Sequence, residues 1–244
     1  MTPAHRVRGR DDVGEREVGL PPAMEDFAAA AWITLPFAAY ILLLGVVAPF
    51  GDAQWSRGDP ILHLVPRPIV GWGAPALGGL AAVVWALVSR PSLRTLGGAA
   101  RGAGVGAVVA AAGVLALRLI HGRELPGFIP AEESAAPGPL LSMCAGYVEE
   151  VVCRLGVLAV AWRLSSRRLP RTVAVVLSAA ASALTFAALH RWGEVEPSNV
   201  YFATRLLLPG FGFGVAALVL RPAYVVSGHC SAHLLLPVLF ATAT

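Results

Sequence analysis

Glu149 and Glu150 are the first candidates for chemistry in this sequence, because these adjacent acids lie inside an apolar stretch. An ionisable side chain within a membrane segment is costly unless it is paired or faces a water-filled cavity, so it predicts a functional site. Arg154 follows Glu150 by four residues, which places both side chains on one face of a helix, where they can pair. Glu149 points about 100° away around the helix, and Cys153 stands four positions after it instead of a basic residue. Glu149 is therefore the better candidate for a working acid or base.

Three histidines occur in two later apolar stretches. His190 ends one stretch and follows Phe186 by four residues. His229 and His233 are also four residues apart, so a helix directs both imidazoles at one point. This spacing is not the HExxH zinc-binding helix, because Cys230 stands where that motif has glutamate. The pair still predicts a site to which one helix contributes two imidazoles.

The elements that must position these residues are membrane helices. The chain has 244 residues, of which 56% are hydrophobic and 14% are charged, and its mean hydropathy is +0.67, unlike a soluble domain. About seven segments reach the roughly 20 apolar residues that a membrane span requires, and lipid offers the backbone no partner outside a helix. We expect an all-α fold, a polytopic transmembrane bundle of about seven helices with the catalytic core in the last four. The expected spans are Phe27–Phe50, Ile69–Val88, Ala99–Ile120, Pro139–Trp162, Thr172–His190, Val200–Leu220 and Ala223–Ala243.

This pattern divides the chain into three parts. Residues 1–26 form a polar tail, residues 27–137 hold three N-terminal helices, and residues 138–244 form the four-helix catalytic core. No removable signal peptide is expected, because the first apolar run lacks a convincing cleavage site. All basic residues are arginines, and most gather at segment ends that would share one side of the membrane. They predict a multi-pass protein of the inner (cytoplasmic) membrane with a cytoplasmic N-terminus and an external C-terminus, and they form no basic stripe for nucleic acid.

The expected spans place the candidate residues at different depths in the bilayer. At 1.5 Å per residue, Glu149, His190 and His229 lie about 21, 27 and 12 Å from the cytoplasmic ends of their spans. We therefore expect tilt, or a helix break near Pro209 or Pro222, to bring them level. The site would then lie in the central to external half of the bilayer.

Three short motifs occur in order on separate expected spans. They read Glu149-Glu150-x-x-x-Arg154, Phe186-x-x-x-His190 and His229-x-x-x-His233. Together they resemble the EExxxR, FxxxH and HxxxN motifs of the CPBP (CAAX protease and bacteriocin-processing) family of glutamic-type intramembrane proteases, which includes eukaryotic prenyl-protein endopeptidases and many bacterial relatives. The resemblance covers roughly Gly138–Leu236 and departs from the family at His233, where asparagine is usual.

The resemblance implies a bacterial intramembrane endopeptidase that hydrolyses a peptide bond of a membrane-associated or exported protein, with C-terminal processing or sorting of surface proteins as the expected subtype. Glu149 would activate a water molecule, and His190 would place it. His229 and His233 would stabilise the oxyanion, a contribution of about 3–4 kcal/mol per donor, while the arginine of the first motif would hold Glu150. The expected partners are a protein or peptide substrate in the membrane and the lipid bilayer.

The usual asparagine leads us to expect no cofactor, because an amide is a poor zinc ligand. Zinc is the alternative, with His190, His229 and His233 as its ligands and Glu149 beside it. The two mechanisms differ in whether position 233 acts as an oxyanion donor or as a metal ligand.

Three other interpretations stay open. A transporter or proton-coupled carrier would use intramembrane Glu, Arg and His as a relay, although the broken half-repeats typical of a carrier are not found. A cysteine transpeptidase of the exosortase type would use Cys153 or Cys144 but would leave two buried glutamates without a task. A family member without catalysis would act as a scaffold or immunity protein. The odd number of cysteines and their apolar surroundings favour core packing for all three thiols.

Overall fold

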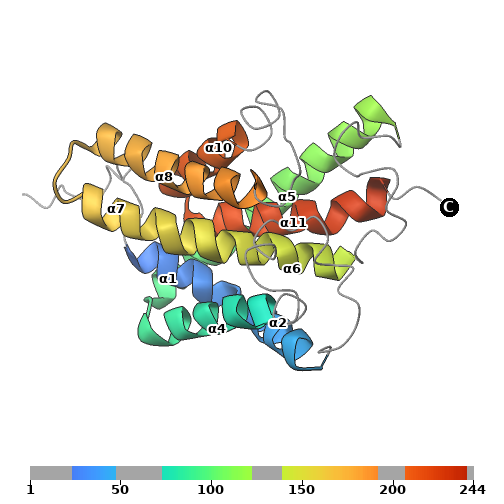
Figure 1. The fold of residues 1–244 in the computed structure, drawn as a ribbon, viewed down its shortest axis with the longest axis horizontal. Helices are drawn as coiled ribbons and strands as arrows, with labels where there is room; N and C mark the ends of the chain where they lie inside the picture. Colours follow the sequence, from blue (N-terminus) through green and yellow to red (C-terminus); the bar gives the residue numbers. More distant parts are fainter. Residues whose placement is uncertain (1–23, 48–72, 123–138, 192–206, 241–244) are drawn as a thin grey trace, which may run out of the picture.

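The computed structural model describes residues 24–47, 73–122, 139–191 and 207–240 (Figure 1). The regular elements in these ranges are all helices, and no described residue is in a strand, so the expected all-α class is confirmed. The elements are α1 (Met24–Ile33), α2 (Leu35–Val47), α4 (Gly73–Val88), α5 (Leu93–His121), α6 (Pro139–Glu150), the π-helix η3 (Val151–Leu158), α7 (Ala159–Ser165), α8 (Arg171–Arg191), α10 (Leu208–Val219) and α11 (Pro222–Phe240).

Two of these helices, α5 and α11, are long and apolar enough to cross a membrane on their own. α1 and α2 add a third candidate if they form one span, bent by 53° at Thr34. Shorter apolar helices cover Gly78–Val88, Arg171–Ala187 and Leu208–Val219. The membrane character is therefore confirmed, whereas the expected count of seven spans is not. Residues 48–50, 69–72, 200–206 and 241–243 of the expected spans lie outside the described residues.

A continuous helical rod runs through the middle of the bundle and carries the two glutamates (Figure 1). This central rod consists of α6, η3 and α7, which follow one another without a gap. In Figure 1, α8 and α10 lie on one side of the central rod and α1, α2 and α4 on the other, while α11 runs beside α6. The rod is therefore in contact with the helices that carry the histidines.

Glycines bring α5 and α11 into close contact. A Cβ atom on Gly106 would overlap the carbonyl group of Tyr224, and a Cβ atom on Gly228 would lie 3.2 Å from the carbonyl oxygen of Gly106. Small residues of this kind allow membrane helices to approach backbone to backbone. Because α11 carries His229 and His233, this contact fixes the helix that presents both imidazoles.

One end of the bundle collects the starts of α1, α5 and α11. Glu25 accepts hydrogen bonds from the backbone N–H of Ser92 at 2.5 Å and from the hydroxyl of Thr95 at 2.9 Å. Arg221 forms an ion pair with Asp26 at 3.4 Å, and the connection from α7 to α8 lies at the same end (Figure 1). We call this the arginine-rich end, because it carries Arg90, Arg94, Arg163, Arg167, Arg168, Arg171 and Arg221. Its cytoplasmic orientation stays a prediction.

Candidate active site

Glu149 and Glu150 lie in the last turn of α6, where the α-helix changes into the π-helix η3. π-Helical turns are rare and occur frequently at functional sites. Ser182 of α8 donates its hydroxyl to the carbonyl oxygen of Cys153 at 2.9 Å, in a buried position. This bond attaches η3 to α8, so the irregular turn that follows the two carboxylates is held by a neighbouring helix.

Glu150 and Arg154 form the ion pair that their spacing predicted. The Oε1 atom of Glu150 lies 3.1 Å from Nη1 of Arg154, and both side chains are fully buried. The guanidinium carbon lies over two aromatic rings, 4.8 Å from the centroid of Phe186 and 5.4 Å from that of Phe213. Cation–π attraction therefore adds to the ion pair. Removing one partner of a buried pair typically costs about 3–5 kcal/mol, because the other charge is left without compensation.

His229 of α11 lies between the two glutamates. Its Nδ1 atom is 2.7 Å from Oε1 of Glu150, and its Nε2 atom is 3.8 Å from Oε2 of Glu149. An ionised carboxylate only accepts hydrogen bonds, so the proton of a neutral imidazole lies on Nδ1 and is donated to Glu150. Nε2 then directs its lone pair towards Glu149, an arrangement that a cation or an additional proton would stabilise.

The contact between Glu149 and His229 shows that α6 and α11 bring their residues to one level, as expected. The expected cause, tilt or a helix break near Pro209 or Pro222, stays a prediction, because residues 200–206 of the span that contains Pro209 lie outside the described residues. Pro209 is in the first turn of α10 and Pro222 is the first residue of α11, where proline is tolerated because the first N–H groups of a helix have no internal partner. The α7–α8 end of the bundle projects beyond the start of α11 (Figure 1).

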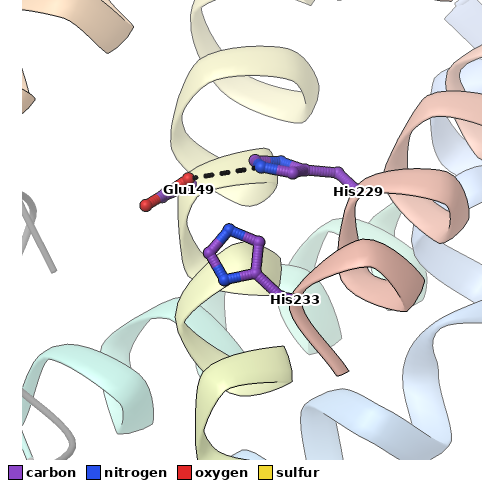
Figure 2. A group of neighbouring side chains, drawn as sticks. All are labelled: Glu149, His229 and His233. Atoms are coloured by element: carbon purple, nitrogen blue, oxygen red, sulfur yellow. Dashed lines mark ion pairs between the residues drawn. The ribbon is translucent and has the colours of Figure 1, made fainter. Parts of the chain in front are cut away.

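Glu149, His229 and His233 form one cluster, with one ligand atom from each residue within 4.8 Å of the others. Figure 2 shows the carboxylate on the central rod facing the two imidazoles on α11. The two rings are 4.7 Å apart and nearly perpendicular. Gly146, one turn before Glu149, makes room for the ring of His233, because a Cβ atom there would lie 2.9 Å from Cδ2 of that histidine.

The cluster fits a zinc ion by residue type, convergence and charge. Imidazole nitrogen and carboxylate oxygen are common zinc ligands, and histidines that bind zinc usually donate their other N–H to an outer group such as a carboxylate, as His229 does to Glu150. The described charged groups of this region are two buried carboxylates and one buried guanidinium. With neutral imidazoles, this set carries an excess negative charge, which is costly in a buried position and which a divalent cation would offset.

The remaining predicted residues have different outcomes. The backbone of His190 is in the last turn of α8, but the position of its side chain lies outside the described residues. The three cysteines, Cys144, Cys153 and Cys230, are buried free thiols. None of them belongs to the cluster of Glu149, His229 and His233. Motif analysis missed Phe213, whose ring centroid is 5.2 Å from that of His229, because an aromatic residue in an apolar span gives no distinguishing signal.

The comparison with known families identifies the class of the chain. Residues 94–231, more than half of the sequence, match the model of the PrsW family of intramembrane metalloproteases. The chain belongs to the PrsW family. No curated protein and no solved structure matches the sequence. This assignment confirms the expected class of intramembrane protease and favours it over the carrier and the transpeptidase. It does not confirm CPBP membership, because the PrsW family is distinct from the CPBP family.

The PrsW match extends from α5 into α11 and includes Glu149, Glu150, Arg154, His190 and His229, whereas His233 lies two residues beyond it. It begins well before Gly138, where the CPBP resemblance began, and so includes α5. A metalloprotease family agrees with the zinc alternative. The preference for a mechanism without metal depended on the CPBP resemblance and loses that support.

Proposed function

We propose that this member of the PrsW family is an endopeptidase in which His229 and His233 hold a zinc ion and Glu149 acts as the general base. The observation that carries the proposal is the convergence of these three side chains within 4.8 Å, beside the junction of α6 and η3. His190 is proposed as a further ligand, because its backbone is one helical turn beyond Phe186. The ring of Phe186 in turn lies 6.1 Å from that of His229.

Glu150 and Arg154 have a positioning role in this proposal. Glu150 accepts the Nδ1 proton of His229 at 2.7 Å, which leaves Nε2 free of a proton on the side of the cluster. Arg154 stabilises the negative charge of Glu150 and keeps it an acceptor. Outer partners of this kind typically contribute about 10–100-fold to metal affinity.

The role proposed for Glu149 is to accept a proton before the peptide bond breaks and to donate it as the bond breaks. A bound zinc ion would supply Lewis-acid chemistry, lowering the pKa of a water molecule and polarising the substrate carbonyl. Glu149 accepts a proton from the attacking water as the water oxygen bonds to the carbonyl carbon. It then gives this proton to the leaving nitrogen as the C–N bond breaks, so the products are a carboxylic acid and an amine.

The depth of the cluster supports a substrate that is itself in the membrane. Glu149 precedes Ser165, the end of the central rod, by 16 residues, which corresponds to roughly 24 Å from the arginine-rich end. If this end faces the cytoplasm, as predicted, the cleaved bond lies in the central or external part of the inner membrane. We therefore propose a membrane-spanning or exported protein as substrate, with C-terminal processing of surface proteins as the context.

Glu149→Gln tests the role of Glu149. Cells that lack the chain would receive the parent protein or the variant, and their membrane and secreted proteins would be compared by mass spectrometry for newly formed termini. We expect termini that require the parent and are absent with Glu149→Gln, because an amide does not accept the proton of water. Glu25→Gln, an acid at the arginine-rich end, is the matched control and should cleave normally.

The zinc content of the same purified proteins decides between two roles for this carboxylate. Glu149→Gln should retain zinc, although with lower affinity, since neither histidine is altered but one negative charge beside the ion is lost. Loss of zinc from a folded Glu149→Gln protein would make Glu149 a ligand and overturn its assignment as the base. Equal cleavage by parent and variant would overturn its participation in the reaction.

A further inference from the structure

A partly open cavity of about 250 Å³ lies at the arginine-rich end, between α1, α4 and α7. Arg163, on its wall, is 14 residues further along the central rod than Glu149, so the cavity is separate from the candidate active site. Its polar and larger lining residues are Met24, Glu25, Trp85, Ser89, Arg90 and Arg163.

The cavity has an excess of positive charge. Arg90 and Arg163 reach it from different parts of the chain, and neither forms an ion pair with any described residue. Glu25 is the acid in the lining, and its carboxylate already accepts hydrogen bonds from Ser92 and Thr95 at the start of α5. Two arginines are thus available to an anion, and their combined charge exceeds that of Glu25 by one.

A hydrogen bond between α1 and α4 fixes the walls of the cavity. The indole N–H of Trp32 donates to the carbonyl oxygen of Ser89 at 2.8 Å, which attaches the end of α4 to α1. A group with several acceptor oxygens, such as a phosphate, would accept hydrogen bonds from both guanidinium groups of the lining.

We propose that this cavity binds the phosphate group of an anionic lipid. Tryptophan and arginine at the ends of apolar helices are typical of the membrane–water interface, and basic pockets between membrane helices bind anionic headgroups. The apolar residues that flank the lining, Leu87, Val88 and Leu93, are 61%, 77% and 87% exposed, so they offer the acyl chains an apolar surface. The cavity is smaller than the roughly 300–1,000 Å³ of drug-sized ligand sites, which suits a headgroup.

Lipid binding to the full-length protein in detergent tests this proposal, with phosphatidylglycerol as the probe and native mass spectrometry to count bound lipid. The parent should retain one phosphatidylglycerol more tightly than phosphatidylcholine. Replacing Arg90 and Arg163 together by glutamine should weaken phosphatidylglycerol binding about 25-fold, at about fivefold per arginine. Replacing either arginine alone should weaken it about fivefold.

The matched control replaces Arg167 and Arg168 by glutamine, which removes the same charge from exposed positions at the same end that do not line the cavity. This control should bind as tightly as the parent, and thermal unfolding would show that every variant is folded. Equal weakening in the control, or unchanged binding in the cavity variants, would overturn the proposal. Inorganic phosphate that displaces phosphatidylglycerol with similar affinity would assign the cavity to free phosphate and overturn the lipid as its source.

Discussion

Glu150 and Arg154 allow the stability of the site to be separated from its affinity for zinc. Glu150→Gln leaves the fully buried guanidinium of Arg154 without its counter-charge. We expect this variant to lose about 3–5 kcal/mol of stability, the usual cost of breaking a buried ion pair. Arg154→Met should lose a similar amount, because it leaves the Glu150 carboxylate buried without its cation.

The double variant Glu150→Gln/Arg154→Met removes both charges and should recover most of this loss. Replacing a whole buried ion pair by uncharged groups is often neutral. Methionine also packs well against aromatic rings, and Phe186 and Phe213 both lie within 5.4 Å of the guanidinium carbon that it would replace. Zinc affinity should nevertheless stay about 10–100-fold below that of the parent, because no carboxylate remains at Nδ1 of His229.

Two assays in detergent follow these quantities without a substrate. Thermal unfolding measures stability, and competition with a chromophoric chelator measures zinc affinity. A double variant with the zinc affinity of the parent would refute the positioning role of Glu150. A double variant as unstable as Glu150→Gln would show that the uncompensated charge of Arg154 does not cause the loss of stability.

Two further predictions concern residues around the cluster. Gly146→Ala should fold, lose about 1–3 kcal/mol of stability through overpacking, and bind zinc more weakly, because the new Cβ atom would lie 2.9 Å from Cδ2 of His233. Gly104→Ala, where nothing lies within 4 Å of the new atom, is its control, and equal effects in calorimetry and zinc titration would contradict the argument. Replacing all three buried cysteines by alanine should preserve zinc content and the parent-dependent termini, since no thiol belongs to the cluster. A folded triple variant that retains zinc but no longer cleaves would support the exosortase-type alternative.

Residue spacing within single helices was sufficient to predict part of the site. The i, i+4 relation placed Arg154 on Glu150 and directed His229 and His233 towards one point, because these contacts depend only on helix geometry. The level contact between Glu149 and His229 followed from the assumption that buried ionisable groups must find partners.

Features that depend on contacts between helices were not predictable in this way. The π-helix η3 is held by a hydrogen bond from the hydroxyl of Ser182 on α8. At the bend between α1 and α2, the hydroxyl of Thr34 is hydrogen-bonded to the hydroxyl of Tyr147 at 3.0 Å. Residue spacing along one segment does not identify Ser182 or Tyr147 as the partner in these contacts. The bonding of Glu150 to Nδ1 of His229 likewise required the relative position of α6 and α11.

The family assignment shows a similar limit. Three short motifs in order suggested the CPBP family, but glutamate, arginine and histidine within membrane helices suit more than one family of intramembrane protease. The PrsW match also includes α5, whose described contribution is close packing of Gly106 against Tyr224 on α11. A helix that supports the site by packing carries no chemical motif, so motif analysis gave it no weight.

The zinc content of the purified parent and of His233→Asn is the most direct test of the central claim. We expect stoichiometric zinc in the parent and loss of both zinc and cleavage in folded His233→Asn, because an amide is a poor zinc ligand. Peptide-bond cleavage by a zinc-free His233→Asn protein, or by the parent after complete removal of metal, would contradict the claim and would favour His233 as an oxyanion donor.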